Sequence, residues 1–419
     1  MPIFTPVLKP IMKPKNLLLA GMLLLACLNL SAQTKGFIDV KGKEIIAPGG
    51  KPFLMRGTNL GNWLIPEGYM FKFKNAASPR LINQLITELI GPDEAIAFWD
   101  KYLHAYITQA DIHYLKSIGV NSIRLPFSYR LFTDETYLGA SNPNRGFELM
   151  DPVVKWCKAE GLYVILDMHC APGGQTGDNI DDGAGYPFLF ESEANQAQTV
   201  AIWKRIAAHY KDETAVMGYD LLNEPIAHYF DKNKFNPMLE PLFKRITKAL
   251  REVDKNHLVF LGGAQWDSNF KVFGAPFDSK LVYTFHKYWT KTTQDVIQEY
   301  VDFRDKYNVP VYCGETGENN DQWIAEFRQL LEKNNIGYHY WPYKKMDAKA
   351  GVITFDQPAA YEQVIAYEKA DHSNFEAIRK AAPADRAAIK AALYQLIENS
   401  TFKNCKPNDG YNKGLGLGL

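Results

Sequence analysis

The stretch YVILDM (Tyr163–Met168) is a short, predominantly apolar run that ends just before a histidine. An amphipathic helical stretch, Glu191–Tyr210, follows it, and a second apolar run, Val216–Leu222, comes next. Runs without a clean polar alternation are typical of strands buried on both faces, as in a parallel sheet covered by helices. The order run, helix, run therefore predicts a β-α-β unit.

The same alternation recurs along most of the chain. Its eight apolar runs are Phe53–Thr58, Val120–Leu125, Tyr163–Met168, Val216–Leu222, Leu258–Gly263, Leu281–Phe285, Val309–Cys313 and Gly337–Trp341. The other helical stretches between them are Pro92–Ser117, Asp151–Glu160, Met238–Val253, Thr293–Tyr307 and Asn320–Asn334. Eight such units in succession predict the α/β class and a (β/α)8 TIM barrel.

Three further segments complete the expected organisation around one catalytic domain at residues 36–405. Gly36–Pro52 has apolar residues on either side of Lys41-Gly42-Lys43, which predicts a small β-hairpin that caps the N-terminal end of the barrel. From about residue 358 to 404 the pattern is helical, so we expect the last barrel helix and an extra C-terminal helical segment. Residues 406–419 are rich in glycine, and we expect a flexible tail there.

Residues 1–32 have the pattern of a secretory signal peptide. Lys13 and Lys15 supply a positive flank, and Leu17–Leu25 is an apolar run too short to span a bilayer comfortably. Ser31-Ala32 then offers a small-residue cleavage site, and a start at Met12 would give a signal of more ordinary length. We expect a protein without a membrane span that is secreted, periplasmic or held at the cell surface.

A lipoprotein signal is the alternative interpretation of the same segment. Leu24-Leu25-Ala26-Cys27 resembles a lipobox, in which Cys27 would carry a lipid anchor. Both interpretations place the folded part of the chain outside the cytoplasm.

Charge and cysteine spacing exclude several classes of function. Acidic and basic residues balance at 47 each, and no lysine or arginine stripe is visible, so we expect no nucleic-acid partner. The remaining cysteines match no zinc or redox spacing, which favours buried free thiols and no metal site; they are Cys157, Cys170, Cys313 and Cys405. We expect a monomer.

Polar and aromatic side chains stand where the predicted strands end. In a (β/α)8 barrel the carboxyl ends of the strands form the functional face, so these residues are expected to converge there. They are Arg124, His169, Asn223, Glu224, His286, Tyr288, Glu315 and Trp341.

Glu224 and Glu315 are the pair of carboxyl groups that glycosidic bond cleavage requires. One carboxyl must be protonated to give a proton to the leaving oxygen, and the other must be ionised to attack the anomeric carbon. We expect Glu315 to be the nucleophile, with Arg124 and Tyr288 as its donors. Glu224 is then the acid/base, with His286 beside it.

The remaining strand-end residues suit the binding of a sugar. Asn223 is placed to bond the sugar 2-hydroxyl, a contact that strengthens in the transition state. Trp341 offers a flat apolar face to the sugar ring, and His169 is placed to bond hydroxyls or to orient the nucleophile.

Taken in order, these segments resemble glycoside hydrolase family 5, the cellulase family of clan A. The resemblance runs from about Phe53 to Trp341 and rests on SIRLP (122–126), LDMH (166–169), LLNEP (221–225), FHKYW (285–289), GET (314–316) and YHYW (338–341). It implies a retaining double displacement, with Glu224 as acid/base, Glu315 as nucleophile and no metal or organic cofactor. The implied substrate is a polysaccharide or oligosaccharide.

Two further stretches resemble the exo-β-1,3-glucanase branch of that family. They are RGTNLGNWLIPEGYM (56–70) and HCAPGGQTGDN (169–179). The resemblance implies substrate recognition by Asn59, Trp63 and Glu67, with Glu67 at the non-reducing-end subsite. Residues around Glu67 differ from the branch pattern.

The substrate stays open between several polymers. A secreted β-glucanase acting on β-1,4 or β-1,3 linkages is the leading hypothesis. The same mechanism acting on β-mannan, xylan or a glycolipid is the alternative, because specificity lies in loops grafted on a shared scaffold. A catalytically silent carbohydrate-binding barrel is the third hypothesis.

Overall fold

The computed structural model describes residues 36–418 of the chain. The signal-peptide prediction for residues 1–32 and the alternative lipid anchor at Cys27 lie outside this range. Among the described residues, no helix is both long and apolar enough to cross a membrane.

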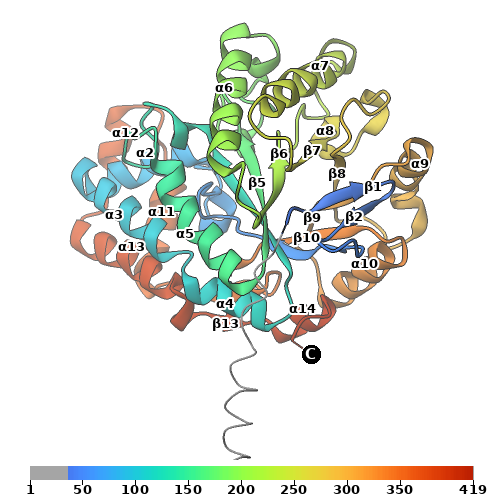
Figure 1. Cartoon of the computed structure of the whole chain (residues 1–419). Helices are drawn as coiled ribbons and strands as arrows, with labels where there is room; N and C mark the ends of the chain where they lie inside the picture. The colour runs from blue at the N-terminus through green and yellow to red at the C-terminus, as the bar shows by residue number, and fades with distance from the viewer. Residues whose placement is uncertain (1–35, 419) are drawn as a thin grey trace, which may run out of the picture. The chain divides into compact units, whose positions relative to one another are not determined.

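The core of the molecule is a closed barrel of eight parallel strands in the order β10-β3-β4-β5-β6-β7-β8-β9. Helices surround these strands, as Figure 1 shows. All eight predicted runs form barrel strands, and the predicted (β/α)8 fold is confirmed. The strands are β3 (Arg56–Asn59), β4 (Ser122–Ser128), β5 (Tyr163–Cys170), β6 (Val216–Asp220), β7 (Leu258–Gly262), β8 (Leu281–Tyr288), β9 (Val311–Gly317) and β10 (Gly337–Trp341).

Each predicted helical stretch contains a helix, with different boundaries, whereas α2 and α8 were not predicted. They are α2 (Pro79–Ile90), α3 (Pro92–Ala105), α4 (Gln109–Ser117), α5 (Arg145–Glu160), α6 (Glu193–Tyr210), α7 (Lys232–Arg251), α8 (Ala264–Asp267), α9 (Gln298–Tyr307) and α10 (Asp321–Lys333). The stretch expected over Pro92–Ser117 is two helices, because Thr108 and Asp111 form a capping box that starts α4.

The N-terminal hairpin consists of β1 (Asp39–Lys41) and β2 (Glu44–Ile46), which pair antiparallel. Ile38 and Ile45 of this segment belong to a separate buried apolar cluster with residues of the barrel interior, including Tyr163, Leu258 and Phe260. Tyr163 and Leu258 begin their strands, so the hairpin covers the end of the barrel where the strands start. The predicted cap is therefore present.

Beyond the barrel, the chain forms a small sheet and an outer layer of helices. Strands β11 (Lys344–Met346), β12 (Ile353–Phe355) and β13 (Lys406–Pro407) make the sheet. The extra helical segment is α11 (Glu362–Glu368), α12 (Phe375–Ala381) and α13 (Arg386–Ser400), and α13 packs against α2 and α3.

The prediction of a flexible tail at residues 406–419 is wrong for the part that the structure describes. Asp409–Gly414 forms α14, which packs against α10. Tyr411 and Leu415 are buried, and the Gly418 amide donates to the carbonyl of Ile118 at the end of α4. The tail thus lies between α10 and α4, where it completes the ring of helices.

The glycines of the tail serve close packing rather than flexibility. A Cβ at Gly410 would lie 2.0 Å from Oδ2 of Asp321. A Cβ at Gly414 would lie 2.9 Å from the backbone carbonyl oxygen of the same aspartate. Glycine has a low helix propensity, so a sequence pattern indicates a loop where tertiary contacts in fact stabilise a helix.

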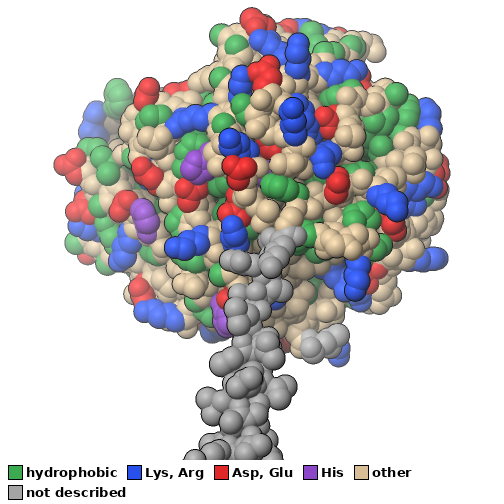
Figure 2. Space-filling model, viewed as in Figure 1, with side chains coloured by type: hydrophobic (Ala, Val, Ile, Leu, Met, Phe, Trp, Pro, Cys, Tyr) green, Lys and Arg blue, Asp and Glu red, His purple; other side chains and the backbone are tan. Residues whose placement is uncertain are grey.

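The surface agrees with the balanced charge of the sequence. Acidic and basic side chains are interspersed over the face shown in Figure 2, without a patch of a single sign.

Leu415→Ala should destabilise the protein by about 2–4 kcal/mol, because the side chain is buried and truncation leaves a cavity. The melting temperature measured by calorimetry should fall by several degrees, while exposed Lys413→Ala serves as the control. Equal melting temperatures for Leu415→Ala and the parent would contradict the packed tail.

Candidate active site

A cavity of about 450 Å³ opens at the carboxyl ends of the barrel strands. Its volume falls within the usual range for small-ligand sites, about 300–1,000 Å³. The predicted site residues that line it are Glu67, His169, Glu224, His286, Tyr288, Glu315 and Trp341. The other lining residues are Tyr69, Asp178, Asn179, Ile180, Trp266, Ser268, Trp289 and Glu318.

The Arg124 side chain lies fully buried below this cavity, surrounded by carboxylates. Nε pairs with Asp220 at 2.9 Å, Nη2 with Asp167 at 3.0 Å, and Nη1 with Glu315 at 2.5 Å. Nη2 also donates to Oδ1 of Asn223, 2.9 Å away. Because a guanidinium stays charged and presents its donors in a rigid plane, this network fixes side chains from several strands at once.

Glu315 is held at both oxygens. Oε1 accepts from Arg124, and Oε2 accepts from the Tyr288 hydroxyl at 3.0 Å. These are the two donors expected from the sequence. Both are anchored on barrel strands, so the carboxylate has a fixed orientation toward the cavity.

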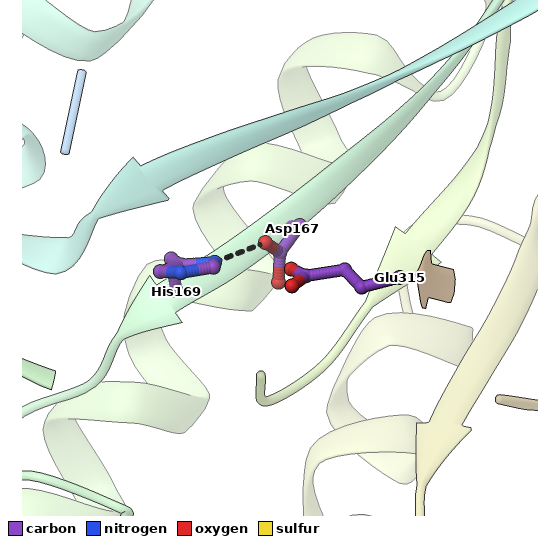
Figure 3. Close-up of side chains that lie close together, drawn as sticks. All are labelled: Asp167, His169 and Glu315. Atoms are coloured by element: carbon purple, nitrogen blue, oxygen red, sulfur yellow. Dashed lines mark hydrogen bonds and ion pairs between the residues drawn. The ribbon is translucent and has the colours of Figure 1, made fainter. Parts of the chain in front are cut away.

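His169 joins the network through Asp167, and Figure 3 shows these two side chains beside Glu315. Its Nδ1 lies 2.8 Å from Oδ2 of Asp167, and Nε2 lies 3.3 Å from Nδ2 of Asn223. Burial lowers the pKa of His169 to about 4, so the ring is neutral near neutral pH. The contacts suit one tautomer, in which Nδ1–H donates to Asp167 and Nε2 accepts from Asn223.

Glu224 follows β6 in an uncommon backbone conformation, with φ of 47°. Its Oε1 lies 2.9 Å from Nδ1 of His286. Burial raises the pKa of Glu224 to about 7, opposed by His169 and Arg124. Positive φ in a residue other than glycine is strained, and such strain often marks functional sites.

Glu224 and Glu315 approach each other closely across the cavity. Together with His286 they present atoms that all lie within 4.8 Å of one another. Nδ1 of His286 is 2.9 Å from Glu224 and 3.8 Å from Glu315. The structure thus brings together two carboxyl groups with different surroundings: one bonded by Arg124 and Tyr288, the other beside a histidine.

The loop after β5 supports Glu224 from outside the barrel. The Thr176 hydroxyl donates to the Glu224 carbonyl at 2.8 Å, and Nε2 of Gln175 donates to the Asn223 carbonyl at 2.8 Å. Asp181 and Asp182 of this loop are buried. Asp181 accepts from backbone amides of the loop, and Asp182 pairs with Arg130, so both carboxylates organise the loop.

One wall of the cavity is formed by Glu67, Tyr69 and Trp341. Nε1 of Trp341 donates to the Tyr69 hydroxyl at 2.7 Å, and its ring packs at 10° to that of His169. Gly61 makes room for Trp341, because a Cβ there would lie 2.5 Å from the indole. Oε1 of Glu67 is buried without a hydrogen-bond partner among the described residues, and Glu67 faces the cavity.

Three predicted substrate-binding residues lie behind the cavity instead of lining it. Trp63 packs in the hydrophobic core, and its indole N–H donates to the Leu103 carbonyl at 2.7 Å. Asn59 is buried and bonds Arg124, Gly314 and His339. Asn223 is buried between Arg124 and His169. In this structure Trp63 packs in the core and Asn59 supports Arg124, and neither side chain lines the cavity.

Three buried aspartates of the site were not predicted from the sequence: Asp167, Asp220 and Asp267. Asp167 and Asp220 had a usable signal, because each is a charged residue inside an otherwise apolar strand and needs a buried partner. Burial raises the pKa of each of these two to about 7, opposed by Arg124. Asp267 lies in a short turn after β7 and carried no motif.

Two groups of these side chains have ligand atoms close enough for a metal ion. They are Asp167, His169 and Glu315, and Glu224, His286 and Glu315. Both groups share Glu315, whose oxygens already accept from Arg124 and Tyr288. The existing hydrogen bonds occupy these atoms, so the arrangement fits acid, base and nucleophile chemistry better than a metal centre.

Comparison with known sequences gives one family match and several relatives. The model of the cellulase family (glycosyl hydrolase family 5) matches residues 90–347. A β-xylosidase of Phanerodontia chrysosporium is 33% identical over 239 residues, covering 57% of this chain and 48% of the relative. Endoglucanase C of Acetivibrio thermocellus is 26% identical over 312 residues, covering 60% and 88%.

A probable glucan 1,3-beta-glucosidase A of Neosartorya fischeri is 28% identical over 215 residues, covering 50% of this chain and 49% of the relative. The chain thus spans about half the length of the xylosidase and the glucosidase that it matches.

Solved structures agree in fold. The crystal structure of an endogalactoceramidase has a TM-score of 0.60 at 18% identity, covering 91% of this chain and 84% of that one. A rutinosidase from Aspergillus niger has a TM-score of 0.53 at 20% identity, covering 70% and 90%. At this identity the likeness concerns the fold alone. The family match spans more than half of the 419 residues, so the chain belongs to glycosyl hydrolase family 5.

Proposed function

We propose that the chain is a secreted, retaining hydrolase that cleaves β-1,4 or β-1,3 linkages of β-glucans. The observation that carries the mechanism is the Glu224–Glu315 pair, with atoms within 4.8 Å of each other and different surroundings. Retaining enzymes hold their two carboxyl groups about 5–5.5 Å apart, whereas inverting enzymes leave room for a water between them.

In the first step, the Glu315 carboxylate attacks the anomeric carbon as the bond to the leaving oxygen breaks. Glu224 gives its proton to that oxygen, so the sugar becomes covalently bound to Glu315 and the aglycone leaves as an alcohol. In the second step, Glu224 takes a proton from water. The water oxygen attacks the anomeric carbon, and Glu315 is released as a carboxylate.

The residues around the pair support sugar binding. Trp341 presents its ring beside His169 at the cavity wall, where a sugar ring would stack. Trp266 and Trp289 lie at the cavity, and Trp289 is 73% exposed, which suits contact with the leaving side of a longer substrate. The endoglucanase and glucosidase relatives support a glucan substrate, and the xylosidase relative makes xylosides the second class to test.

The location and the assembly are also proposals. The basic flank, apolar run and small-residue site within residues 1–32 support export, with lipid attachment at Cys27 as the alternative. Mass spectrometry of the mature N-terminus distinguishes them: a start near Gln33 supports cleavage by the general pathway, and a lipid-modified Cys27 supports the alternative. We propose a monomer with one catalytic domain.

Glu315→Gln should abolish hydrolysis of aryl β-glucosides and glucans, with kcat reduced by about four orders of magnitude or more. The amide cannot form the glycosyl-enzyme, while Arg124 and Tyr288 still find an acceptor. Turnover and circular dichroism are measured together, with exposed Glu376→Gln as the control. Turnover near that of the control in a folded Glu315→Gln protein would refute the nucleophile assignment.

Activity should decline as the pH rises through about 7, because Glu224 must be protonated to act as the acid and burial raises its pKa to that value. The kcat/KM of a phenyl β-glucoside, measured against pH, should show this basic limb. In Glu224→Gln the limb should disappear along with most of the activity. A wild-type profile that stays flat well above neutrality would contradict the assignment.

Glu67→Ala should lower kcat/KM on short β-glucan oligosaccharides by about tenfold or more, because the sugar would lose its hydrogen bond to a buried carboxyl that faces the cavity.

A panel of laminarin, lichenan, cellulose, mannan and xylan identifies the polymer that the enzyme cleaves. If Glu67 binds the terminal sugar, glucose is the first product. Longer products from the wild type, with Glu67→Ala unaffected, would contradict an exo-acting site.

A further inference from the structure

Asp267 is a buried carboxyl directly beneath the proposed acid/base. It ends the short helix α8, in which Gln265, Trp266 and Asp267 have φ of 54°, 57° and 55°. A left-handed conformation is strained for residues other than glycine, so a run of three persists only where its surroundings require it. The strained turn places Trp266 at the cavity and turns Asp267 into the protein interior.

The Asp267 carboxylate touches the acid/base region at two points through one oxygen. Oδ2 lies 3.3 Å from the backbone nitrogen of Glu224 and 3.2 Å from Nε2 of His286. The first contact holds the backbone of Glu224 in its positive-φ conformation. The second connects Asp267 to the imidazole that bonds the Glu224 side chain.

Two glycines leave the space that this arrangement needs. A Cβ at Gly262 would lie 1.9 Å from Oδ1 of Asp267, and a Cβ at Gly314 would lie 2.9 Å from Nε2 of His286. Both glycines belong to barrel strands, so the space is part of the fold and not of a mobile loop.

His286 connects the two carboxyl groups. Its Nδ1 is 2.9 Å from Oε1 of Glu224. Its Nε2 is buried without a hydrogen-bond partner among the described residues, and Oδ2 of Asp267 lies 3.2 Å from it. Burial lowers the pKa of His286 to about 3, so near neutral pH the ring is neutral and has a single N–H. When that hydrogen lies on Nε2 and points to Asp267, Nδ1 is an acceptor, and Glu224 completes the hydrogen bond only if it keeps its own proton.

We propose that Asp267 is a positioning residue for Glu224, holding its backbone in place and orienting the tautomer of His286 so that Glu224 retains its proton until the glycosidic bond breaks. This inference rests on the proposed role of Glu224 as acid/base.

The surroundings define the competing arrangement. Burial raises the pKa of Asp267 well above its usual range, with Asp220 and Glu224 adding to the effect. If Asp267 kept the proton instead, it would donate to Nε2, and Nδ1–H would point to an ionised Glu224. Among the described residues, the other charged or titratable groups around Glu224 and His286 are Glu67, Arg124, Asp167, His169, Asp178, Asp220, Tyr288 and Glu315. These groups influence both arrangements, so an experiment must locate the proton.

Nitrogen-15 NMR of the wild-type enzyme with labelled histidine tests the tautomer directly. Among the nine histidines, the signal of His286 is identified by its loss in His286→Gln. Between the pKa of His286, about 3, and that of Glu224, about 7, we expect the Nε2–H tautomer. The Nδ1–H tautomer would overturn the proposal, whether or not any Asp267 variant folds.

Asp267→Asn tests the consequence for catalysis. The variant keeps the size of the side chain but removes its negative charge. Both contacts meet at the Oδ2 position, where an NH2 group would donate to Nε2 and lose the contact with the Glu224 N–H, or an uncharged oxygen would accept from both groups more weakly; in either case the Nε2–H tautomer loses support. The basic limb of kcat/KM on a phenyl β-glucoside should move about one pH unit or more toward acid, as expected when a nearby charge and a hydrogen bond change. At pH 7 the rate should fall about tenfold or more.

The leaving group separates this effect from general damage. A 2,4-dinitrophenyl β-glucoside needs no proton from the acid, so its kcat/KM should stay within about twofold of the wild type. In a His286→Gln background, adding Asp267→Asn should shift the limb no further. An unmoved basic limb, equal losses on both substrates, or a full shift without His286 would each overturn the proposal.

Asp254→Asn is the matched control. Asp254 is also buried and pairs with a buried histidine, His257, but it lies at the opposite end of the barrel, before β7. This variant loses the same kind of contact and should leave the basic limb in place. If the wild type cleaves no β-glycoside at all, the proposed function fails. If the wild type is active and only Asp267→Asn behaves otherwise than expected, the positioning role fails alone.

Discussion

The buried guanidinium of Arg124 is the interaction on which the rest of the site depends. From β4 it reaches Asn59 on β3, Asp167 on β5, Asp220 on β6 and Glu315 on β9. Removing one member of such a network leaves other charges buried without a partner, which typically costs about 3–5 kcal/mol. The network therefore both positions the candidate catalytic groups and couples their geometry to the closure of the barrel.

One cation also faces more carboxyl groups than it can neutralise. Asp167, Asp220 and Glu315 all pair with Arg124, and Glu224 and Asp267 lie in the next layer. Burial raises the pKa of Asp167, Asp220 and Glu224 to about 7, so part of the excess charge is removed by bound protons. Several carboxyl groups of such a site therefore remain partly protonated near neutral pH, because they are buried together. General acid catalysis then requires that one of these protonated carboxyl groups lies next to the substrate.

Much of the fold was predictable, because the eight apolar runs and the helical stretches between them can be recognised in the sequence without knowledge of any tertiary contact. The residues at the strand ends were predictable for the same reason, because a closed parallel barrel must bring Glu224, Glu315 and His286 together. Trp63 shows what a sequence pattern cannot predict. It stands beside motif residues in sequence, but packing turns its indole toward Leu103 and the core. The tail shows a related limit, since its glycines reflect close contacts with Asp321 that only the assembled structure contains.

Asp267 could not have been found from sequence, because its role depends on a left-handed turn and on two contacts that cross the barrel. Its position nevertheless explains how two glutamates on neighbouring parts of one rim differ in chemistry. Glu315 receives hydrogen bonds from a permanent cation and a phenol, so its two oxygens are already acceptors. Glu224 has the neutral imidazole of His286 beside it, and Asp267 lies on the other side of that imidazole. In the proposed mechanism, the two glutamates therefore differ because of the groups around them and not because of their own carboxyl groups. Arg124 and Tyr288 surround Glu315, whereas His286, with Asp267 on its other side, lies beside Glu224.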